Sequence, residues 1–314
     1  MLQQTQVATV IPYYRRFLQA FPNVQSLAHA PLERVLEHWS GLGYYRRARH
    51  LHQAARWIVE RFQNRFPRVY DDASSLPGIG EYTARAVLSI AFDQPYAVLD
   101  GNVARVVARL RAHRGNLHQG RFRRAVESEL AQLLSPRRPG DFNQAMMELG
   151  QTVCLPRAPR CPLCPLKKWC RARALGRPES YPAPRPRRAA ELRYLAAAII
   201  RRGPRVALVR GLDEGLMSDL WNFPSAFGAT RQAALAYLTE KLDALAPAQT
   251  VIGSPLGGLR HGITFRAIHV ELYSAQVSGR LPNGSGRWVR LGEFHRLAVS
   301  QLARKIAARI AQHA

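Results

Sequence analysis

All four cysteines of this 314-residue chain lie in one short stretch, CLPRAPRCPLCPLKKWC, at residues 154–170. Their spacing is Cys154-x6-Cys161-x2-Cys164-x5-Cys170. Prolines recur through the stretch and exclude a continuous helix, so the thiols stand on a loop. Thiols gathered on so short a loop are typical of a metal centre, and this part of the chain must fold around them.

Three interpretations of the cluster remain open on spacing alone. Disulfides are disfavoured inside a reducing cell. Structural zinc usually takes two separated pairs of closely spaced ligands, and only Cys161 and Cys164 form a close pair. A [4Fe–4S] cluster needs four thiolates around one cube, which an irregular loop can supply. The spacing favours iron–sulfur over zinc and over inert thiols.

The charge of the chain indicates a polyanionic partner. The formal net charge is +25 and the pI about 11.2, above the value of about 9 that is typical of nucleic-acid-binding domains. Arginine in place of lysine can reflect codon bias, but such a bias does not explain the shortage of acidic residues. We therefore expect salt-dependent binding of nucleic acid. Cations also surround the cysteines, at Arg157, Arg160, Lys167, Lys168, Arg171 and Arg173.

Two domains of different composition are predicted. Up to about residue 150, apolar residues recur at helical spacing, as in 7–21 and 51–62, and most of them are expected in the core. The segment 171–190 is rich in proline and arginine and has the composition of a linker. Beyond it, 192–211 predicts two strands joined by a Gly-Pro turn. Further strands are predicted at 266–277 and 286–291 and helices at 231–245 and 298–312, so the second domain is α+β.

The segment SSLPGIGEYTARAVLSIAF, at 74–92, predicts a helical hairpin. Gly78, Ile79 and Gly80 would form a tight turn whose backbone N–H groups, at a helix start, can bind a phosphate without reading sequence. The pattern is short and is also common in ordinary turns. About twenty residues on, Asp100 precedes Gly101 at a second helix start, where it is either an N-cap or a functional carboxylate.

Taken together, the hairpin, Asp100 and the four cysteines resemble the helix–hairpin–helix DNA glycosylases that carry an iron–sulfur loop. Within that group, MLQQTQVATVIPYY, LDGNV, GLGYYRRAR and FNQAMMELG are similar to the MutY adenine DNA glycosylases. GLMSDLWNFP, at 215–224, resembles their Nudix-like reader of 8-oxoguanine. The resemblance implies a mostly α glycosylase domain at 1–175, a linker at 176–190 and an α+β Nudix-like domain at 191–314. We find no Nudix hydrolase box, so this second domain should recognise and not hydrolyse.

The resemblance implies a role for each matching residue. The [4Fe–4S] cluster would be held by the four cysteines, and adenine mispaired with 8-oxoguanine or guanine would be flipped out of double-stranded DNA. Asp100 would stabilise the cation that develops on the sugar, with Tyr82 and Asn102 beside it. Tyr82 stands where endonuclease III-type enzymes carry a lysine, so strand cleavage through a Schiff base is not expected. The implied substrate contacts are Gln144 on the adenine, Gln4 and Tyr44 wedged near 8-oxoguanine with Gln3 beside them, and His261 and Thr264 in the reader.

Two departures from the family pattern stand out. The family's general acid is a Glu two residues before the position of Met1, so we expect a truncated sequence or a mis-called start codon, with the 314 residues alone nearly inactive. In the reader, Arg260-His261 is followed by GITF, which puts Thr264 and Phe265 in place of a Ser-His pair. We therefore expect a retained but weaker preference for 8-oxoguanine.

Other classes of function remain open. The same scaffold could bind lesions without excising a base, or could remove thymine or uracil from mismatches, although the Nudix-like domain argues against the latter. A protein with structural zinc is a third alternative. The chain has no run of about 18 apolar residues and no signal-peptide pattern, so we expect a cytoplasmic monomer associated with DNA and not with membranes.

Overall fold

The computed structural model describes residues 1–3, 5–184, 189–212, 220–245, 250–263, 265–277 and 286–312. By its contacts the chain divides into two compact units, one of Met1–Arg56 with Arg188–Ala314 and one of Trp57–Arg187. The predicted domain boundaries at 175 and 191 stay a prediction. None of the helices in the described ranges is long and apolar enough to cross a lipid bilayer.

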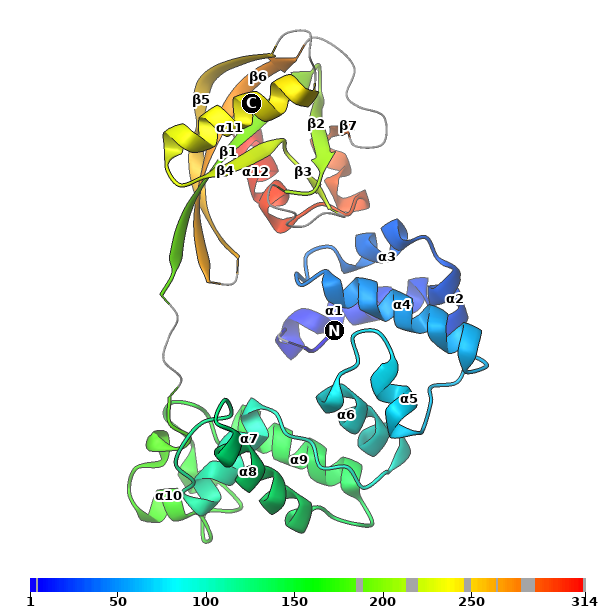
Figure 1. Cartoon of the computed structure of the whole chain (residues 1–314), viewed down its shortest axis with the longest axis vertical. Helices are drawn as coiled ribbons and strands as arrows, with labels where there is room; N and C mark the ends of the chain where they lie inside the picture. Colours follow the sequence, from blue (N-terminus) through cyan, green and yellow to red (C-terminus); the bar gives the residue numbers. More distant parts are fainter. Residues whose placement is uncertain are drawn as a thin grey trace. The chain divides into compact units, whose positions relative to one another are not determined.

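The first unit begins with helices that follow the predicted periodicity (Figure 1). They are α1 (Val7–Ala20), α2 (Val24–His29), α3 (Leu32–Trp39) and α4 (Arg46–Arg61). On α1, only Val10 and Phe17 are buried. The expectation that its apolar positions are core is therefore wrong for four of the six, because apolar side chains circle the helix and only one stripe packs inward. Its exposed apolar residues are Val7, Ile11, Tyr14 and Leu18.

The second unit is helical, as predicted for this part of the chain (Figure 1). Its helices are α5 (Tyr70–Ser75), α6 (Glu81–Phe92), α7 (Gly101–Arg111), α8 (Gly120–Leu133), α9 (Pro139–Thr152) and α10 (Arg171–Ala174). Helices α7, α8 and α9 share an apolar core that includes Val103, Val107, Val126 and Met146. This core fixes α7, the helix that follows Asp100.

The part of the first unit that follows residue 188 is built on one mixed sheet. In the described residues its strands are β1 (Glu191–Arg202), β2 (Arg205–Arg210), β3 (Trp221–Asn222), β4 (Ser225–Gly228), β5 (Thr250–Ile263), β6 (Arg266–Val277) and β7 (Gly286–Arg290). The order is β3-β2-β1-β6-β5, with β4 paired to β1 and β7 paired to β2. β1 and β6 run parallel, and the other pairs run antiparallel.

A helix covers each face of this sheet (Figure 1). From β1, Ala196, Ala198 and Ile200 share a core with α11 (Arg231–Leu245), while Leu195 and Ile199 share one with α12 (Gln301–Ala311). Burial of both faces explains why β1 reads as a continuous apolar run instead of an alternating one. The strands predicted at 192–211, 266–277 and 286–291 and both helices are confirmed, whereas the long strand β5 had not been predicted.

The segment predicted as a linker is partly packed against the second unit. Tyr181 is 4% exposed, and its carbonyl accepts a hydrogen bond of 3.0 Å from Arg109 Nε. Ala172, in α10, is fully buried. The proline-rich composition therefore predicts the absence of long elements here but not the absence of packing.

Candidate active site and nucleic-acid interface

The predicted hairpin is a tight turn between α5 and α6. The Ile79 N–H donates to the Leu76 carbonyl over 3.0 Å, and Gly78 between them has φ +75°. A positive φ after proline is the geometry that Pro-Gly favours, and other residues strain there. Gly80 is the N-cap of α6. The turn is confirmed, but the Ile79 N–H is already used inside it, so any phosphate contact of this turn must come from neighbouring donors.

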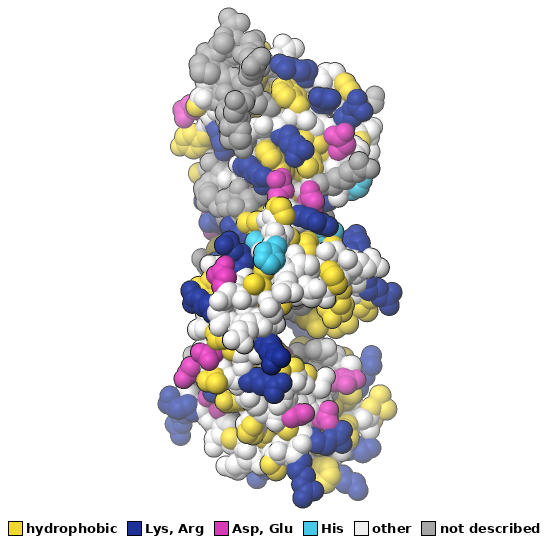
Figure 2. Space-filling model, turned by 90° about the vertical axis from the view of Figure 1, so that its right-hand side faces the viewer, with side chains coloured by type: hydrophobic (Ala, Val, Ile, Leu, Met, Phe, Trp, Pro, Cys, Tyr) yellow, Lys and Arg dark blue, Asp and Glu magenta, His cyan; other side chains and the backbone are white. Residues whose placement is uncertain are grey.

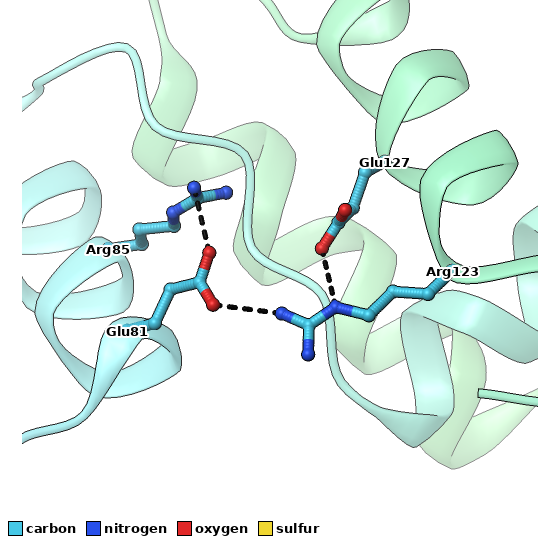
Figure 3. Close-up of polar contacts among 4 residues, drawn as sticks. All are labelled: Glu81, Arg85, Arg123 and Glu127. Atoms are coloured by element: carbon cyan, nitrogen blue, oxygen red, sulfur yellow. Dashed lines mark hydrogen bonds and ion pairs between the residues drawn. The ribbon is translucent and has the colours of Figure 1, made fainter. Parts of the chain in front are cut away.

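An ion-pair network adjoins the hairpin (Figure 3). Glu81 opens α6 and pairs with Arg85 of the same helix and Arg123 of α8, each at 2.9 Å. Arg123 also pairs with Glu127 at 2.8 Å. Exposed pairs of this kind stabilise a fold by only about 0–1 kcal/mol each. Their effect here is to offset the charge of Glu81, which would otherwise repel a phosphate at the start of α6.

Asp100 caps α7 and is also held in a fixed orientation. Its Oδ1 accepts from the backbone N–H of Asn102 at 2.8 Å and of Val103 at 2.7 Å. Its Oδ2 accepts from Asn102 Nδ2 at 3.2 Å. The carboxylate is half-buried, so it can still face a ligand. In this geometry Asp100 can be the N-cap of α7 and a functional carboxylate at the same time.

Tyr82 lies in the electrostatic field of Asp100. Its hydroxyl donates to Met147 Sδ over 3.6 Å, and its side chain is 39% exposed. Burial and, secondarily, the charge of Asp100 raise the pKa of Tyr82 above its ordinary value. The phenol therefore stays protonated at neutral pH and can act as a hydrogen-bond donor beside a carboxylate.

Helices α7 and α9 approach each other closely at Asn102. A Cβ on Gly150 would lie 2.6 Å from Asn102 Cβ and 3.0 Å from its backbone carbonyl. Gly140, at the other end of α9, faces the Ser89 carbonyl at 2.6 Å in the same way. Glycine at these two positions is the sequence signal for the close approaches, and Gly150 explains why the FNQAMMELG motif ends in glycine.

We expect Gly150→Ala to displace Asn102 and, with it, Asp100. A displacement of about 1 Å at reacting groups costs about 10²-fold in rate, so single-turnover base release should fall by about that factor. Gly120→Ala is the matched control, because its Cβ would meet only the flexible end of Arg124 at 3.4 Å. Equal rates for the two variants would contradict this account of Gly150.

Asn143 is a buried residue that the sequence did not point to. It is 1% exposed, its Nδ2 donates to Ser89 Oγ at 2.9 Å and to the Tyr96 carbonyl at 2.8 Å, and its Oδ1 accepts from Val98 N at 3.1 Å. It thus holds the segment that leads to Asp100. The predicted contact Gln144 is its neighbour on α9 and is exposed, with Nε2 3.4 Å from the Gly140 carbonyl.

Two arginines on α7 join the helix of Asp100 to the cysteine loop, and neither had been predicted. Arg105 donates from Nη2 to Asn102 Oδ1 at 2.9 Å and from Nε to the Cys154 carbonyl at 2.7 Å. Arg109 is 2% exposed and donates to Cys154 Sγ at 3.3 Å, and also to the carbonyls of Leu155 and Pro156 at 2.7 and 3.0 Å. Their spacing of four residues places both arginines on one helix face, and this spacing could have indicated a shared partner from the sequence.

The four cysteines are free thiols, each partly buried. Burial raises the pKa of the Cys154 thiol, and the hydrogen bond from Arg109 opposes that rise. Across the described ranges, no group of three or more His, Cys, Asp and Glu side chains is arranged to hold a metal ion. The donor set still fits soft iron or zinc, because four thiols stand on one loop and the Arg109 guanidinium can offset thiolate charge.

In the first unit, Arg47 holds the segment of Gln3 and the loop of Tyr44. It donates to the carbonyls of Met1, at 2.7 Å, and of Gln3, and also to that of Gly43, at 3.2 Å. Its guanidinium lies 5.3 Å from the centre of the Tyr44 ring. Tyr44 is 51% exposed with φ +48°, a rare conformation for a residue with a side chain. Gln4 lies outside the described residues.

His261 stands on β5, opposite Ile268 of β6, and is 9% exposed. Burial lowers its pKa, and the charge of Lys305 lowers it further, so the imidazole is neutral at pH 7. Its Nδ1 is buried and has no protein partner. Thr264 lies outside the described residues, and so do residues 215–219 of the 215–224 motif.

On one face of the molecule, the positive charge is distributed and not gathered in one patch. On the face seen in Figure 2, Lys and Arg side chains are scattered among apolar and neutral ones, with fewer acidic ones between them. The exposed part of the cysteine loop also carries Trp169, 68% exposed, and Leu163, 71% exposed. A partner bound by charge would therefore meet cations on several elements.

The chain is similar to known proteins along its length. Residues 1–135 match the HhH-GPD superfamily of base excision DNA repair proteins, and residues 195–309 match the NUDIX domain. The adenine DNA glycosylase of Rattus norvegicus is 36% identical over 98% of this chain and 69% of its own length. That of Homo sapiens is 34% identical over 98% and 66%. A solved non-covalent endonuclease III–DNA complex is 26% identical over 54% of this chain and 78% of that one, with a TM-score of 0.48.

Proposed function

This chain belongs to the adenine DNA glycosylase family of base excision DNA repair proteins, and from that premise we propose that it removes adenine mispaired with 8-oxoguanine or guanine. The observation that carries the proposal is the Asp100 carboxylate. Three N–H groups hold it, and the protonated Tyr82 phenol lies near it. The reaction hydrolyses the bond between adenine and deoxyribose, and water supplies a hydroxyl to the sugar and a proton to the base.

The chemistry follows from the charge that develops during cleavage. The target adenine must leave the stack, because its glycosidic bond is inaccessible inside a duplex. As the bond breaks, its electrons go to adenine and positive charge grows on the sugar. A carboxylate already oriented by Asn102 and Val103 stabilises that charge without reorganisation. Because Tyr82 offers a phenol and no amine, the reaction ends at base release and leaves the strand intact.

The four cysteines would hold a [4Fe–4S] cluster, which supplies a rigid centre to the loop at 154–170. Support comes from the donor set and from Arg109, whose hydrogen bond to Cys154 Sγ suits a thiolate ligand. Metal analysis of purified protein should find iron and acid-labile sulfide, with visible absorption that bleaches on reduction. Zinc without iron would contradict the cluster and would leave the base-release proposal standing.

The Nudix-like domain is proposed to read the opposite base. His261 supports this role, because its imidazole is neutral and lies on β5, three residues before Thr264 in the sequence. Thr264, in place of the family's serine, keeps a hydroxyl. Thr264→Ala should lower the ratio of base release from 8-oxoguanine:A over G:A, and an unchanged ratio would count against this loop.

The deciding measurement is single-turnover adenine release from an 8-oxoguanine:A duplex. It is run with the 314 residues and with a form that carries the family's Ser-Glu pair upstream of Met1, where the resemblance puts the general acid. General acid catalysis contributes about 10²- to 10⁴-fold, and we expect the extended form to be faster by that factor. Binding of the duplex without release by either form would identify a lesion-binding relative. Faster release from thymine or uracil mismatches would identify another glycosylase.

A further inference from the structure

The loop between α3 and α4 carries Tyr44 in a strained conformation. Gly41 and Gly43 have φ +107° and +70°, and Tyr44 follows with φ +48°. A Cβ on Gly41 would lie 2.2 Å from the hydroxyl of Tyr13, so no residue with a side chain fits at position 41. Backbone held in sparsely populated regions persists only where the surroundings over-determine it. The contacts that fix this loop therefore show what holds Tyr44 in its strained conformation.

Several of those contacts come from the Nudix-like domain, which forms one compact unit with residues 1–56. The Val299 carbonyl accepts from Ser40 Oγ at 3.1 Å and from the Tyr45 hydroxyl at 3.4 Å. Arg304, on α12, donates from Nη2 to Ser40 Oγ at 2.9 Å. The Tyr45 hydroxyl in turn accepts from the Gly41 N–H at 3.1 Å. We call Ser40, Tyr45, Val299 and Arg304 the Val299 latch.

A second contact braces the same segment of the Nudix-like domain. Glu33 Oε1, on α3, accepts from Arg210 Nη2 at 3.1 Å and from Trp221 Nε1 at 3.3 Å. The backbone of Trp221 is hydrogen-bonded to the residues on either side of Val299. Its N–H donates to the Ala298 carbonyl at 2.9 Å, and its carbonyl accepts from Ser300 N at 3.2 Å. Val299 is fully buried. The latch is thus part of a packed junction and not a pair of exposed side chains.

Helix α12 links this junction to His261 on β5. Arg304 reaches Ser40, and the next residue, Lys305, lies close enough to His261 for its charge to act on that imidazole. Leu302 and Ile306 of the same helix are buried in the domain core, so the helix is anchored there. A shift of α12 would therefore change the surroundings of both His261 and Ser40.

We propose that the Val299 latch is a positioning device through which the Nudix-like domain holds the Tyr44 loop, so that Ser40, Tyr45 and Arg304 set lesion discrimination without touching the DNA. The inference rests on the proposed function and on the place beside 8-oxoguanine that the family resemblance implies for Tyr44. The latch itself is tested independently of activity. The partner is the duplex with 8-oxoguanine, because the family resemblance implies contacts of both Tyr44 and His261 with that base.

The first test is hydrogen exchange of the peptide 41–47 in Arg304→Met. This variant leaves the acceptor of the Gly41 N–H in place, so faster exchange reports a loosened loop and not a deleted bond. We expect exchange about tenfold faster in this peptide and unchanged exchange in 154–170. The matched control is Arg309→Met, an exposed arginine on the same helix. Ser40→Ala, which removes the other half of the contact, should reproduce the effect.

The second test is single-turnover base release on two duplexes. In Arg304→Met and Ser40→Ala, the preference for 8-oxoguanine:A over G:A should fall by about tenfold, with duplex affinity changed by less than about threefold. Unchanged exchange at 41–47 in both variants overturns the latch. Faster exchange with unchanged preference overturns the link to discrimination, as does an equal loss on both duplexes. If the unaltered protein releases no adenine, the proposed function fails, and the exchange result still decides whether the latch exists.

Discussion

Asp100→Asn should abolish most adenine release while leaving the fold intact. Asparagine is as good an N-cap as aspartate, so the bonds from the N–H groups of Asn102 and Val103 can persist. The substitution removes the negative charge that faces the developing sugar cation. Removal of one preorganised electrostatic group typically costs about 10²- to 10³-fold in rate, and we expect at least this loss under single-turnover conditions.

The control for Asp100 is Asp141→Asn, an exposed carboxylate on α9 that pairs with Arg138. It should leave the rate within about twofold, since exposed pairs contribute little. Duplex binding by Asp100→Asn should match that of the unaltered protein, and its melting temperature should change by no more than a few degrees. Near-normal release by this variant would show that Asp100 is only a helix cap and that the reacting carboxylate must be sought elsewhere.

Arg109→Met should unfold the cysteine loop. The guanidinium is buried and serves the carbonyls of Leu155, Pro156 and Tyr181 as well as Cys154 Sγ. Each buried acceptor left without a partner costs about 1–3 kcal/mol, so the loss should be at least about 3 kcal/mol. For a unit of this size, that corresponds to a fall in melting temperature of about 10 °C. The iron of the proposed cluster should be lost at the same time.

Arg111→Met is the matched control on the same helix. Arg111 pairs with Glu129 at 2.9 Å, but its side chain is 42% exposed, so its loss should cost no more than about 1 kcal/mol. Calorimetry and metal content of the two variants, measured side by side, check the prediction. A melting temperature for Arg109→Met as high as that of Arg111→Met would show that the loop does not depend on this arginine.

Local patterns predicted the elements of this protein well. The hairpin turn follows from Pro77 and Gly78, because proline fixes its own φ and glycine tolerates the positive φ that comes next. The N-cap of α7 follows from Asp100, and α11 has the predicted bounds of 231–245. The burial of α1 could not be predicted, since apolar residues on both of its sides gave no indication of which side packs.

The sequence by itself determined the identity of the candidate groups: one carboxylate at a helix start, a phenol in place of an amine, and four thiols on one loop. These follow from residue type and spacing, which act over a few residues. Only the tertiary structure decided what holds these groups. Asn143, Gly150, Arg105 and Arg109 reach partners about 45 residues or more away. Ser40 meets Val299 from 259 residues away. Such contacts depend on how helices pack, and packing is a property of the whole chain that no local pattern contains.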